Sequence, residues 1–191
     1  MPGAVVLTLP GWQNSGPGHW QTLWEHRHGY QRVEQHDWLR PLRGDWIARL
    51  DEVLLAQPAH ARVLLAAHSL GCIQVAAWAA HSGLTSRVHG ALLVAPGDVE
   101  RDDLRAQLPS WSPIARRRLP FRSILLGSQD DPYCSAERAQ AMAADWGAVY
   151  RDMGSRGHLN ADSGLGDWHD GLDYLQQLAE MAHNSDMAFS A

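Results

Sequence analysis

The sequence predicts a three-layer α/β fold with a mostly parallel sheet of about six strands and helices on both faces. Short apolar runs alternate with longer segments whose apolar residues recur at three- and four-residue steps, the pattern of βαβ units. Two of these runs, Val63–Ala67 and Ala91–Ala95, are apolar throughout, which is typical of strands buried on both faces. The 191-residue chain has 45% hydrophobic and 19% charged residues, ordinary values for a folded domain.

Each expected element follows from its local pattern. Strands are predicted at Ala4–Leu9, Gln31–Gln35, Arg62–Ala67, Val88–Ala95, Phe121–Leu126 and Ala148–Asp152. Helices are predicted at His19–His28, Leu42–Leu55, Leu70–Ala80, Ala136–Trp146 and Asp167–Met181, because apolar residues there keep helical spacing. No linker rich in Pro, Gly or Ser divides the chain. We therefore expect one domain over residues 1–183 and a disordered C-terminal tail over residues 184–191.

One long segment interrupts this alternation. Residues Pro96–Pro120 contain several prolines, two acidic pairs and Trp111. Loops longer than about 12–15 residues are uncommon unless they are functional or contain a short helix. Because the segment follows the end of a strand, we expect a flap over the top of the sheet rather than inert surface decoration.

Composition and charge exclude several classes of function. The net charge is −5, and the basic run Arg116–Arg118 is expected to be a solvated loop, so no nucleic-acid partner is predicted. Pro10 and Gly11 end the first apolar run too early for a secretory signal. No apolar run reaches the ~18–20 residues of a membrane span, so we expect a cytoplasmic protein without membrane association. Cys72 and Cys134 are too few for a disulfide scaffold and are expected to be reduced.

A nucleophile motif lies between the third predicted strand and the following helix. A nucleophile elbow is a strained turn with small residues two positions before and after its serine, and Ala67 and Gly71 stand at those positions around Ser69. Such a turn lifts the serine hydroxyl above the sheet edge and places the Leu70 amide at the positive end of a helix. The simpler alternative is that Ser69 only caps the helix.

His158 is the predicted general base. A serine hydroxyl needs an imidazole to take its proton, and the imidazole needs a carboxylate to hold its tautomer. Among eleven histidines, His158 lies in the turn-forming segment Gly154–Asn160, after the last predicted strand and before the last helix. In folds with a nucleophile elbow, the triad follows the chain order Ser, acid, His, which places the base after the last strand, where His158 lies.

Two adjacent carboxylates compete for the role of orienting acid. The strand Phe121–Leu126 is followed by Gly127–Pro132, at the carboxyl edge where open α/β sheets bind ligands. We expect Asp131 to orient the imidazole and Asp130 to cap the turn or bind its amides, although either could take the role. The plain alternative is a solvated turn.

The loop after the first strand is expected to supply the second oxyanion amide, beside that of Leu70. Gly11 permits a sharp turn there, and the amide of Trp12, then that of Gln13, is the preferred donor. The side chains expected to line the substrate pocket are Gln13, His19, Trp20, His68 and Trp111. Tryptophan can line an apolar acyl pocket, but in a chain with nine of them core packing is an equally strong alternative.

Together these motifs resemble those of the small α/β-hydrolases related to retinoblastoma-binding protein 9 and the YdeN-type serine hydrolases. The resemblance rests on Pro10-Gly11-Trp12 with Gly18-His19-Trp20, His68-Ser69-Leu70-Gly71-Cys72, Asp130-Asp131-Pro132 and Gly157-His158-Leu159-Asn160, and covers nearly the whole chain. It implies an α/β-hydrolase fold with no large lid domain, a triad of Ser69, Asp131 and His158, and ester or amide substrates. Ala67 in place of the usual glycine is the departure from the pattern.

The predicted function is hydrolysis of a small-molecule carboxylic ester or amide through an acyl-enzyme on Ser69. The amides of Trp12 and Leu70 would hold the oxyanion, and neither a metal nor a cofactor is expected. One alternative is a non-catalytic binding protein on a hydrolase scaffold. A dinucleotide-binding enzyme is disfavoured, because only Gly16-Pro17-Gly18 imitates the required glycine fingerprint. The sequence leaves open whether the protein is a homodimer.

Overall fold

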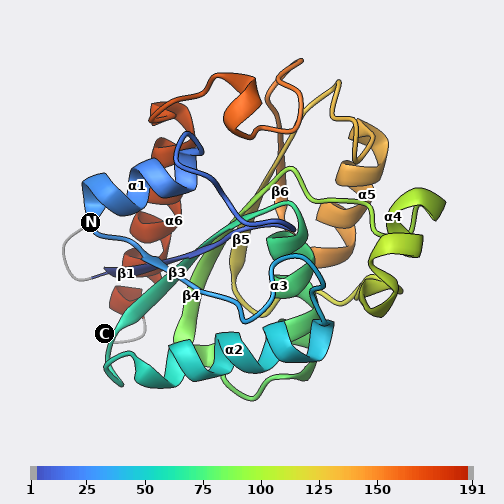
Figure 1. Cartoon of the computed structure of the whole chain (residues 1–191). Coiled ribbons are helices and arrows are strands. Elements are labelled where there is room, and N and C mark those ends of the chain that lie inside the picture. Colours follow the sequence, from blue (N-terminus) through green and yellow to red (C-terminus); the bar gives the residue numbers. More distant parts are fainter. Residues whose placement is uncertain (1–3, 189–191) are drawn as a thin grey trace.

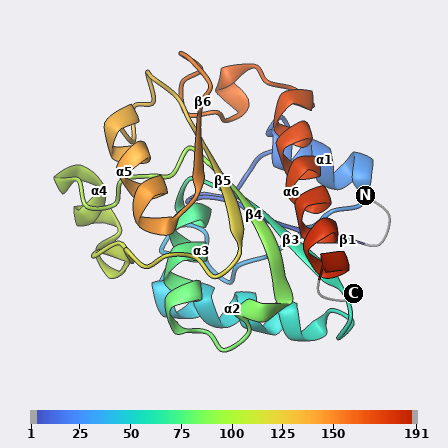
Figure 2. The same cartoon turned by 180° about the vertical axis from the view of Figure 1, so that it is seen from behind.

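The computed structural model has a six-stranded sheet between two layers of helices (Figures 1 and 2). It describes residues 4–188, with side chains through Glu180. The strands are β1 (Ala4–Leu9), β2 (Gln31–Arg32), β3 (Arg62–His68), β4 (Val88–Val94), β5 (Arg122–Gly127) and β6 (Val149–Asp152). The helices are α1 (Trp20–His28), α2 (Arg43–Ala56), α3 (Leu70–His81), α4 (Asp102–Gln107), α5 (Ala136–Trp146) and α6 (His169–Ala188). The predicted three-layer α/β fold is confirmed.

Every strand pair in this sheet is parallel, and the strand order is β2-β1-β3-β4-β5-β6. His68 pairs with Val94, and Gly127 with Asp152, so neighbouring strands end level with one another. Parallel strands all point their carboxyl ends to one edge. The loops that follow β1, β3, β5 and β6 therefore meet there.

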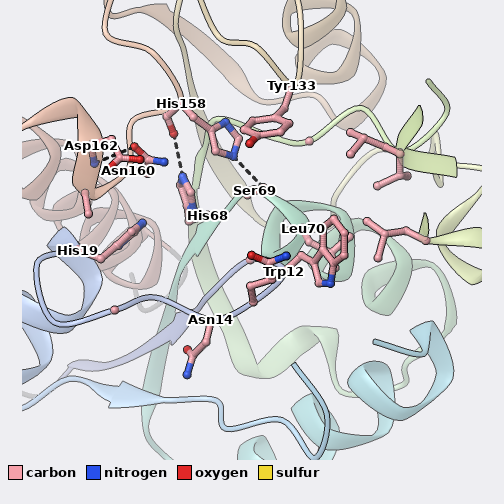
Figure 3. Close-up of a pocket in the computed structure, with 18 residues that line it drawn as sticks. Trp12, Asn14, His19, His68, Ser69, Leu70, Tyr133, His158, Asn160 and Asp162 are labelled. Carbon is pink, nitrogen blue, oxygen red and sulfur yellow. Dashed lines mark hydrogen bonds between the residues drawn. The ribbon is translucent and has the colours of Figure 1, made fainter. Parts of the chain in front are cut away.

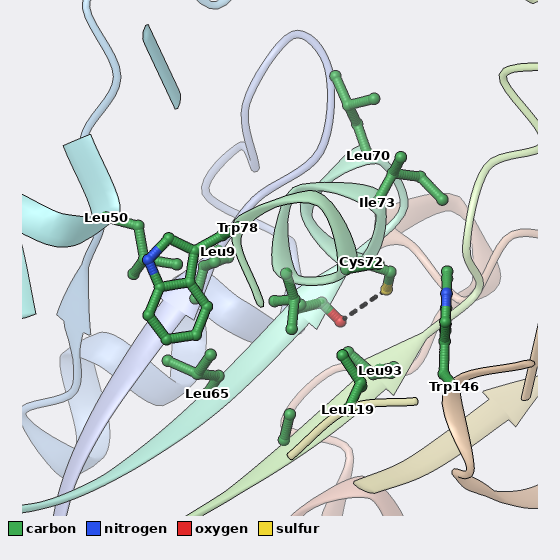
Figure 4. Close-up of a cluster of buried hydrophobic side chains, with 14 of the residues drawn as sticks. Leu9, Leu50, Leu65, Leu70, Cys72, Ile73, Trp78, Leu93, Leu119 and Trp146 are labelled. Atoms are coloured by element: carbon green, nitrogen blue, oxygen red, sulfur yellow. Dashed lines mark hydrogen bonds between the residues drawn. The ribbon is translucent and has the colours of Figure 1, made fainter. Parts of the chain in front are cut away.

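Apolar side chains of the strands alternate between the two faces of the sheet. Along β3, Val63 and Leu65 belong to one buried cluster, whereas Leu64 and Ala66 belong to another. The first cluster packs under α2, α3 and α5 (part of it is drawn in Figure 4), and the second packs under α1 and α6. Burial on both faces holds the sheet rigid beneath the loops of its carboxyl edge. None of the helices described is both long and apolar enough to span a lipid bilayer.

Two element boundaries differ from the prediction by more than two residues. β2 ends at Arg32 instead of Gln35, since the chain leaves the edge of the sheet after the Val33 amide bonds the carbonyl of Thr8. α6 extends past Met181 to Ala188, because no proline or glycine interrupts that stretch. Residues 184–188, expected to be part of a disordered tail, are therefore helical, and residues 189–191 lie outside the described part.

The segment 96–120 is packed rather than a flap over its whole length. It contains α4 and a short 3-10 turn, Pro109–Trp111. Beyond that turn, Ile114 and Leu119 join the first core cluster. Only the first half of the segment, residues 97–108, reaches the carboxyl edge of the sheet and borders a cavity there.

Candidate active site

Ser69 occupies a strained turn between β3 and α3. Its φ of 52° and ψ of −118° lie outside the regions that residues with a Cβ ordinarily adopt. The turn is crowded: a Cβ on Gly71 would lie 2.2 Å from the carbonyl oxygen of Leu9, so glycine is required there. The Ser69 side chain makes no capping bond to α3, which removes the simple alternative of a helix cap.

His158 joins this serine to a carboxylate. Its Nε2 lies 2.9 Å from Oγ of Ser69 (Figure 3), and its Nδ1 lies 2.9 Å from each carboxylate oxygen of Asp131. An ionised carboxylate only accepts hydrogen bonds, so Nδ1 carries the proton and Nε2 accepts from the serine hydroxyl. The Asp131 side chain is 2% exposed and that of His158 is 9% exposed. The carboxylate is thus shielded from water and directed at the ring.

Asp130 binds backbone instead of the imidazole. Its Oδ1 accepts hydrogen bonds from the Gly157 amide at 2.7 Å and from the Ser128 hydroxyl at 2.9 Å. The bond from Gly157, followed by that from Ser128, holds the pKa of Asp130 below its ordinary value. Gly157 has a φ of 57° and directly precedes His158. The structure therefore brings Asp131 to the ring and Asp130 to the turn that carries the ring.

The backbone amides of Trp12 and Leu70, the predicted oxyanion donors, belong to residues that border the cavity, and neither amide donates a hydrogen bond within the described chain. Leu70 is the first residue of α3, where an amide has no partner inside the helix and the helix dipole is positive. The Gln13 amide, the second choice from sequence, donates to the Trp38 carbonyl at 3.0 Å and so cannot serve as an oxyanion donor. The amides of Trp12 and Leu70 are free to accept this role, which stays a prediction.

A cavity of about 400 Å³ lies over Ser69 (Figure 3). Of the predicted lining residues, Gln13, His19 and His68 border it, together with the residues of the predicted triad and oxyanion amides except Asp131. Among residues 4–180, no group of three or more His, Cys, Asp or Glu side chains could hold a metal ion.

Two of the predicted lining residues were wrong. Trp20 is buried against Trp24 and Trp168, and its indole N–H donates to the Leu159 carbonyl at 2.9 Å. Trp111 is buried on the other face of the sheet, where its indole donates to a backbone carbonyl at 2.9 Å. A buried indole needs an acceptor, and both rings find one in the protein core, away from the cavity.

The sequence did not indicate several side chains that border the cavity: Asn14, Val99, Leu104, Leu108, Tyr133 and Asn160. Tyr133 follows Asp131 by two positions and its ring lies 4.6 Å from that of His158, so nearness to the predicted triad could have identified it. The three apolar residues come from the segment 97–108, whose short helix has no clear periodicity.

His19 and His68 are buried next to His158 and are neutral at pH 7. Burial, then the positive charge of Arg32 and a smaller electrostatic effect of His158, lowers the pKa of His19 to about 3. Burial also lowers the pKa of His68, with smaller effects from His19 and His158. Nδ1 of His19 accepts the Gln21 amide at 3.2 Å and caps α1. These two rings therefore act as uncharged polar walls beside the imidazole that contacts Ser69.

Comparison with known proteins identifies the class to which this fold and site belong. The family model of serine hydrolases matches residues 6–177. The chain therefore belongs to the serine hydrolase family and is a hydrolase. A comparison with curated protein sequences finds no significant match.

Solved structures support the same assignment. A YdeN-like hydrolase from Pectobacterium atrosepticum SCRI1043 is 27% identical, with a TM-score of 0.82 over 94% of this chain and 92% of that one. The ydeN gene product of Bacillus subtilis is 19% identical, with a TM-score of 0.73 over 93% and 99% of the two chains. The esterase RhEst1 from Rhodococcus sp. ECU1013, at 14% identity and a TM-score of 0.63, matches 95% of this chain and 90% of its own. The resemblance to YdeN-type hydrolases is confirmed. The ydeN gene product and RhEst1 show that this chain has their fold.

Proposed function

We propose that this serine hydrolase cleaves a small carboxylic ester, or an amide, through an acyl-enzyme on Ser69. The observation that carries the proposal is the pair of contacts made by His158, from Nε2 to Ser69 and from Nδ1 to Asp131, each at 2.9 Å. A serine hydroxyl is a weak nucleophile by itself. These contacts supply a base for its proton and a carboxylate to orient that base.

In the first half of the reaction, Oγ of Ser69 attacks the carbonyl carbon while Nε2 of His158 takes the hydroxyl proton. The carbonyl oxygen becomes an oxyanion, for which the amides of Trp12 and Leu70 are the donors. When the tetrahedral intermediate collapses, the bond to the alcohol breaks and His158 returns its proton to the departing oxygen. An ester now joins the acyl group to Ser69.

In the second half, water replaces the serine as nucleophile. His158 takes a proton from the water as its oxygen attacks the acyl carbon, and the same amides hold the second oxyanion. The bond to Oγ breaks, His158 protonates Ser69, and the carboxylic acid leaves. Asp131 stabilises the imidazolium in both halves and keeps its own charge. Amide cleavage uses the same groups with an amine as leaving group.

Labelling and mutation of Ser69 test this proposal. A fluorophosphonate probe should modify Ser69, located by mass spectrometry of the labelled peptide. Ser69→Ala should remove labelling and reduce hydrolysis of p-nitrophenyl butyrate by on the order of 10⁶ in kcat, as removal of a serine nucleophile does in a protease. Ser86→Ala is the matched control, because Ser86 is exposed and does not border the cavity. This variant should retain both probe labelling and ester hydrolysis.

Two outcomes would contradict the proposal. Turnover by Ser69→Ala above about a hundredth of wild type would move the nucleophile elsewhere. A wild-type protein that neither reacts with the probe nor hydrolyses any ester or amide, while still binding such compounds, would favour the non-catalytic alternative.

A further inference from the structure

One wall of the cavity over Ser69 is apolar. It is formed by the side chains of Trp12, Leu70, Val99, Leu104 and Leu108. The last three come from a single stretch, residues 97–108, and each is at most 6% exposed. A ligand that reached this wall would meet hydrocarbon and the indole ring, and no charged group of α4.

Leu104 has the most informative position in this wall. It is the single buried residue of α4, whose other residues face solvent. Yet Leu104 belongs to neither of the two core clusters, whereas Val99 and Leu108 belong to the first. The one apolar side chain that anchors α4 is therefore directed at the cavity and not at the sheet.

The remaining side of the cavity is polar. His19, His68, Asn160 and Asp162 border it. The ring of His68 lies 4.8 Å from that of His158 and 4.7 Å from that of His19, so this polar wall adjoins the imidazole.

The two walls lie on different sides of the serine. In Figure 3 the polar wall lies on one side of Ser69, and Trp12 and Leu70 lie on the other. The departing alcohol must receive its proton from Nε2 of His158, so it belongs on the imidazole side. The acyl part of the ester then extends toward the apolar wall.

We propose that Leu104, with Val99 and Leu108, forms the binding site for the acyl chain, and that the substrate is an ester of an uncharged, apolar carboxylic acid of short or medium length. The inference rests on the proposed function, because the acyl chain takes this direction only if Ser69 attacks the ester carbonyl. A charged end on the chain is excluded, since the wall has no partner for a buried charge. The volume of about 400 Å³ is near the lower end of ligand pockets and limits the chain length.

A chain-length series measures this site directly. The substrates are the p-nitrophenyl esters of acetic, butyric, hexanoic, octanoic and decanoic acids, and the readout is kcat/KM. For the wild type, each methylene that fits the wall should raise kcat/KM by about fourfold, until the chain exceeds the cavity and the values fall. Leu104→Ala lengthens the cavity and should move the maximum to a longer acid, raising the decanoate-to-butyrate ratio roughly tenfold. Leu104→Phe fills it and should move the maximum to a shorter acid.

Leu119→Ala is the matched control. Leu119 is 5% exposed, against 6% for Leu104, but it packs in the first core cluster and does not border this cavity. Its truncation should lower the melting temperature and leave the position of the chain-length maximum unchanged. A shift in this control equal to that of Leu104→Ala would assign the effect to general loss of packing and overturn the inference.

Two further measurements separate failure of the inference from failure of the proposed function. If the fluorophosphonate labels Ser69 in every variant but neither Leu104 variant moves the maximum, the acyl site is wrong and the proposed function stands. If Leu104→Ala instead changes the profile for acetate esters of alcohols of increasing length, the wall holds the leaving group and the inference is also overturned. Absence of both labelling and hydrolysis in the wild type would remove the proposed function, and the inference with it.

Discussion

Nε2 of His68 donates a hydrogen bond to the carbonyl oxygen of His158 at 2.9 Å. This bond joins the residue before Ser69 to the backbone of the residue that contacts Ser69 through its side chain. The bond is buried, so loss of the His68 donor would leave the His158 carbonyl without a hydrogen bond and destabilise the folded protein. The turn after β3 and the loop after β6 are thereby held at a fixed separation.

Removal of this donor should therefore affect rate more than substrate affinity. We expect His68→Phe to lower kcat by roughly 10- to 100-fold, because small displacements of a reacting group have effects of this size, while KM changes less. His68→Gln, whose amide can donate, should recover part of the rate. Steady-state kinetics on both variants measures the effect, and an unchanged kcat in a folded His68→Phe would show that the bond does not position His158.

The adjacent carboxylates should respond differently to conversion to asparagine. Asp131→Asn keeps the shape but loses the charge and can present the wrong tautomer to His158, so kcat should fall by on the order of 10⁴. Asp130→Asn should keep at least about a tenth of the activity and lower the melting temperature, because it weakens only bonds to the turn. Measured kcat and thermal midpoints decide, and the reverse pattern would transfer the orienting role to Asp130.

Acid should destabilise the fold through its buried histidines before its carboxylates titrate. The pKa of His19 is about 3 in the folded protein and 6.5 for the free side chain. Below pH 6.5, His19 is therefore protonated in the unfolded chain but stays neutral in the folded protein. Stability is thus complete above pH 6.5 and falls as pH decreases toward 4, by up to about 1.4 kcal/mol per pH unit for one such histidine.

His19→Asn isolates this contribution. Asparagine can cap α1 as His19 does but does not titrate, so the free energy of unfolding should depend less steeply on pH between 4 and 6.5. Urea unfolding across this range provides the slope. The same slope in variant and wild type would mean that His19 is protonated in the folded state.

Two helical glycines provide a matched pair for the turn at Ser69. Gly71→Ala places a Cβ 2.2 Å from the Leu9 carbonyl oxygen and should destabilise the protein by about 3 kcal/mol, the upper part of the range for overpacking. Gly44, in α2, has no atom within 4 Å of an added Cβ, so Gly44→Ala should stabilise by about 0.5–1 kcal/mol. Denaturant midpoints of both variants test whether crowding at the Ser69 turn requires glycine at position 71. Equal effects of the two substitutions would contradict that requirement.

The sequence predicts most of this fold because most elements carry their own signal. β3 and β4 are apolar runs, and α5 has both helical spacing and a serine cap. α4 has no such signal, because among its six residues only Leu104 is buried. The end of β2 depends on where an edge strand leaves its neighbour, which is a tertiary contact and not a local pattern.

The site is predictable to the extent that it depends on chain order. Ser69, Asp131 and His158 each follow a strand in the order typical of the motif, and the structure brings them into contact. Their catalytic roles stay predictions. The walls depend on the packing of distant segments, which is why Trp20 and Trp111 were wrongly placed in the cavity.

The loop between β5 and α5 meets the loop after β6 residue by residue. The Ser128 hydroxyl and the Gln129 amide both bond the Gly154 carbonyl, Asp130 bonds Gly157, and Asp131 bonds the next residue along. An insertion or deletion of one residue in either loop would shift the register of these hydrogen bonds, so that each later residue would lose its partner in the other loop. We therefore expect relatives to vary the residues of these loops more freely than their lengths, and any change of length in one to be accompanied by a change in the other.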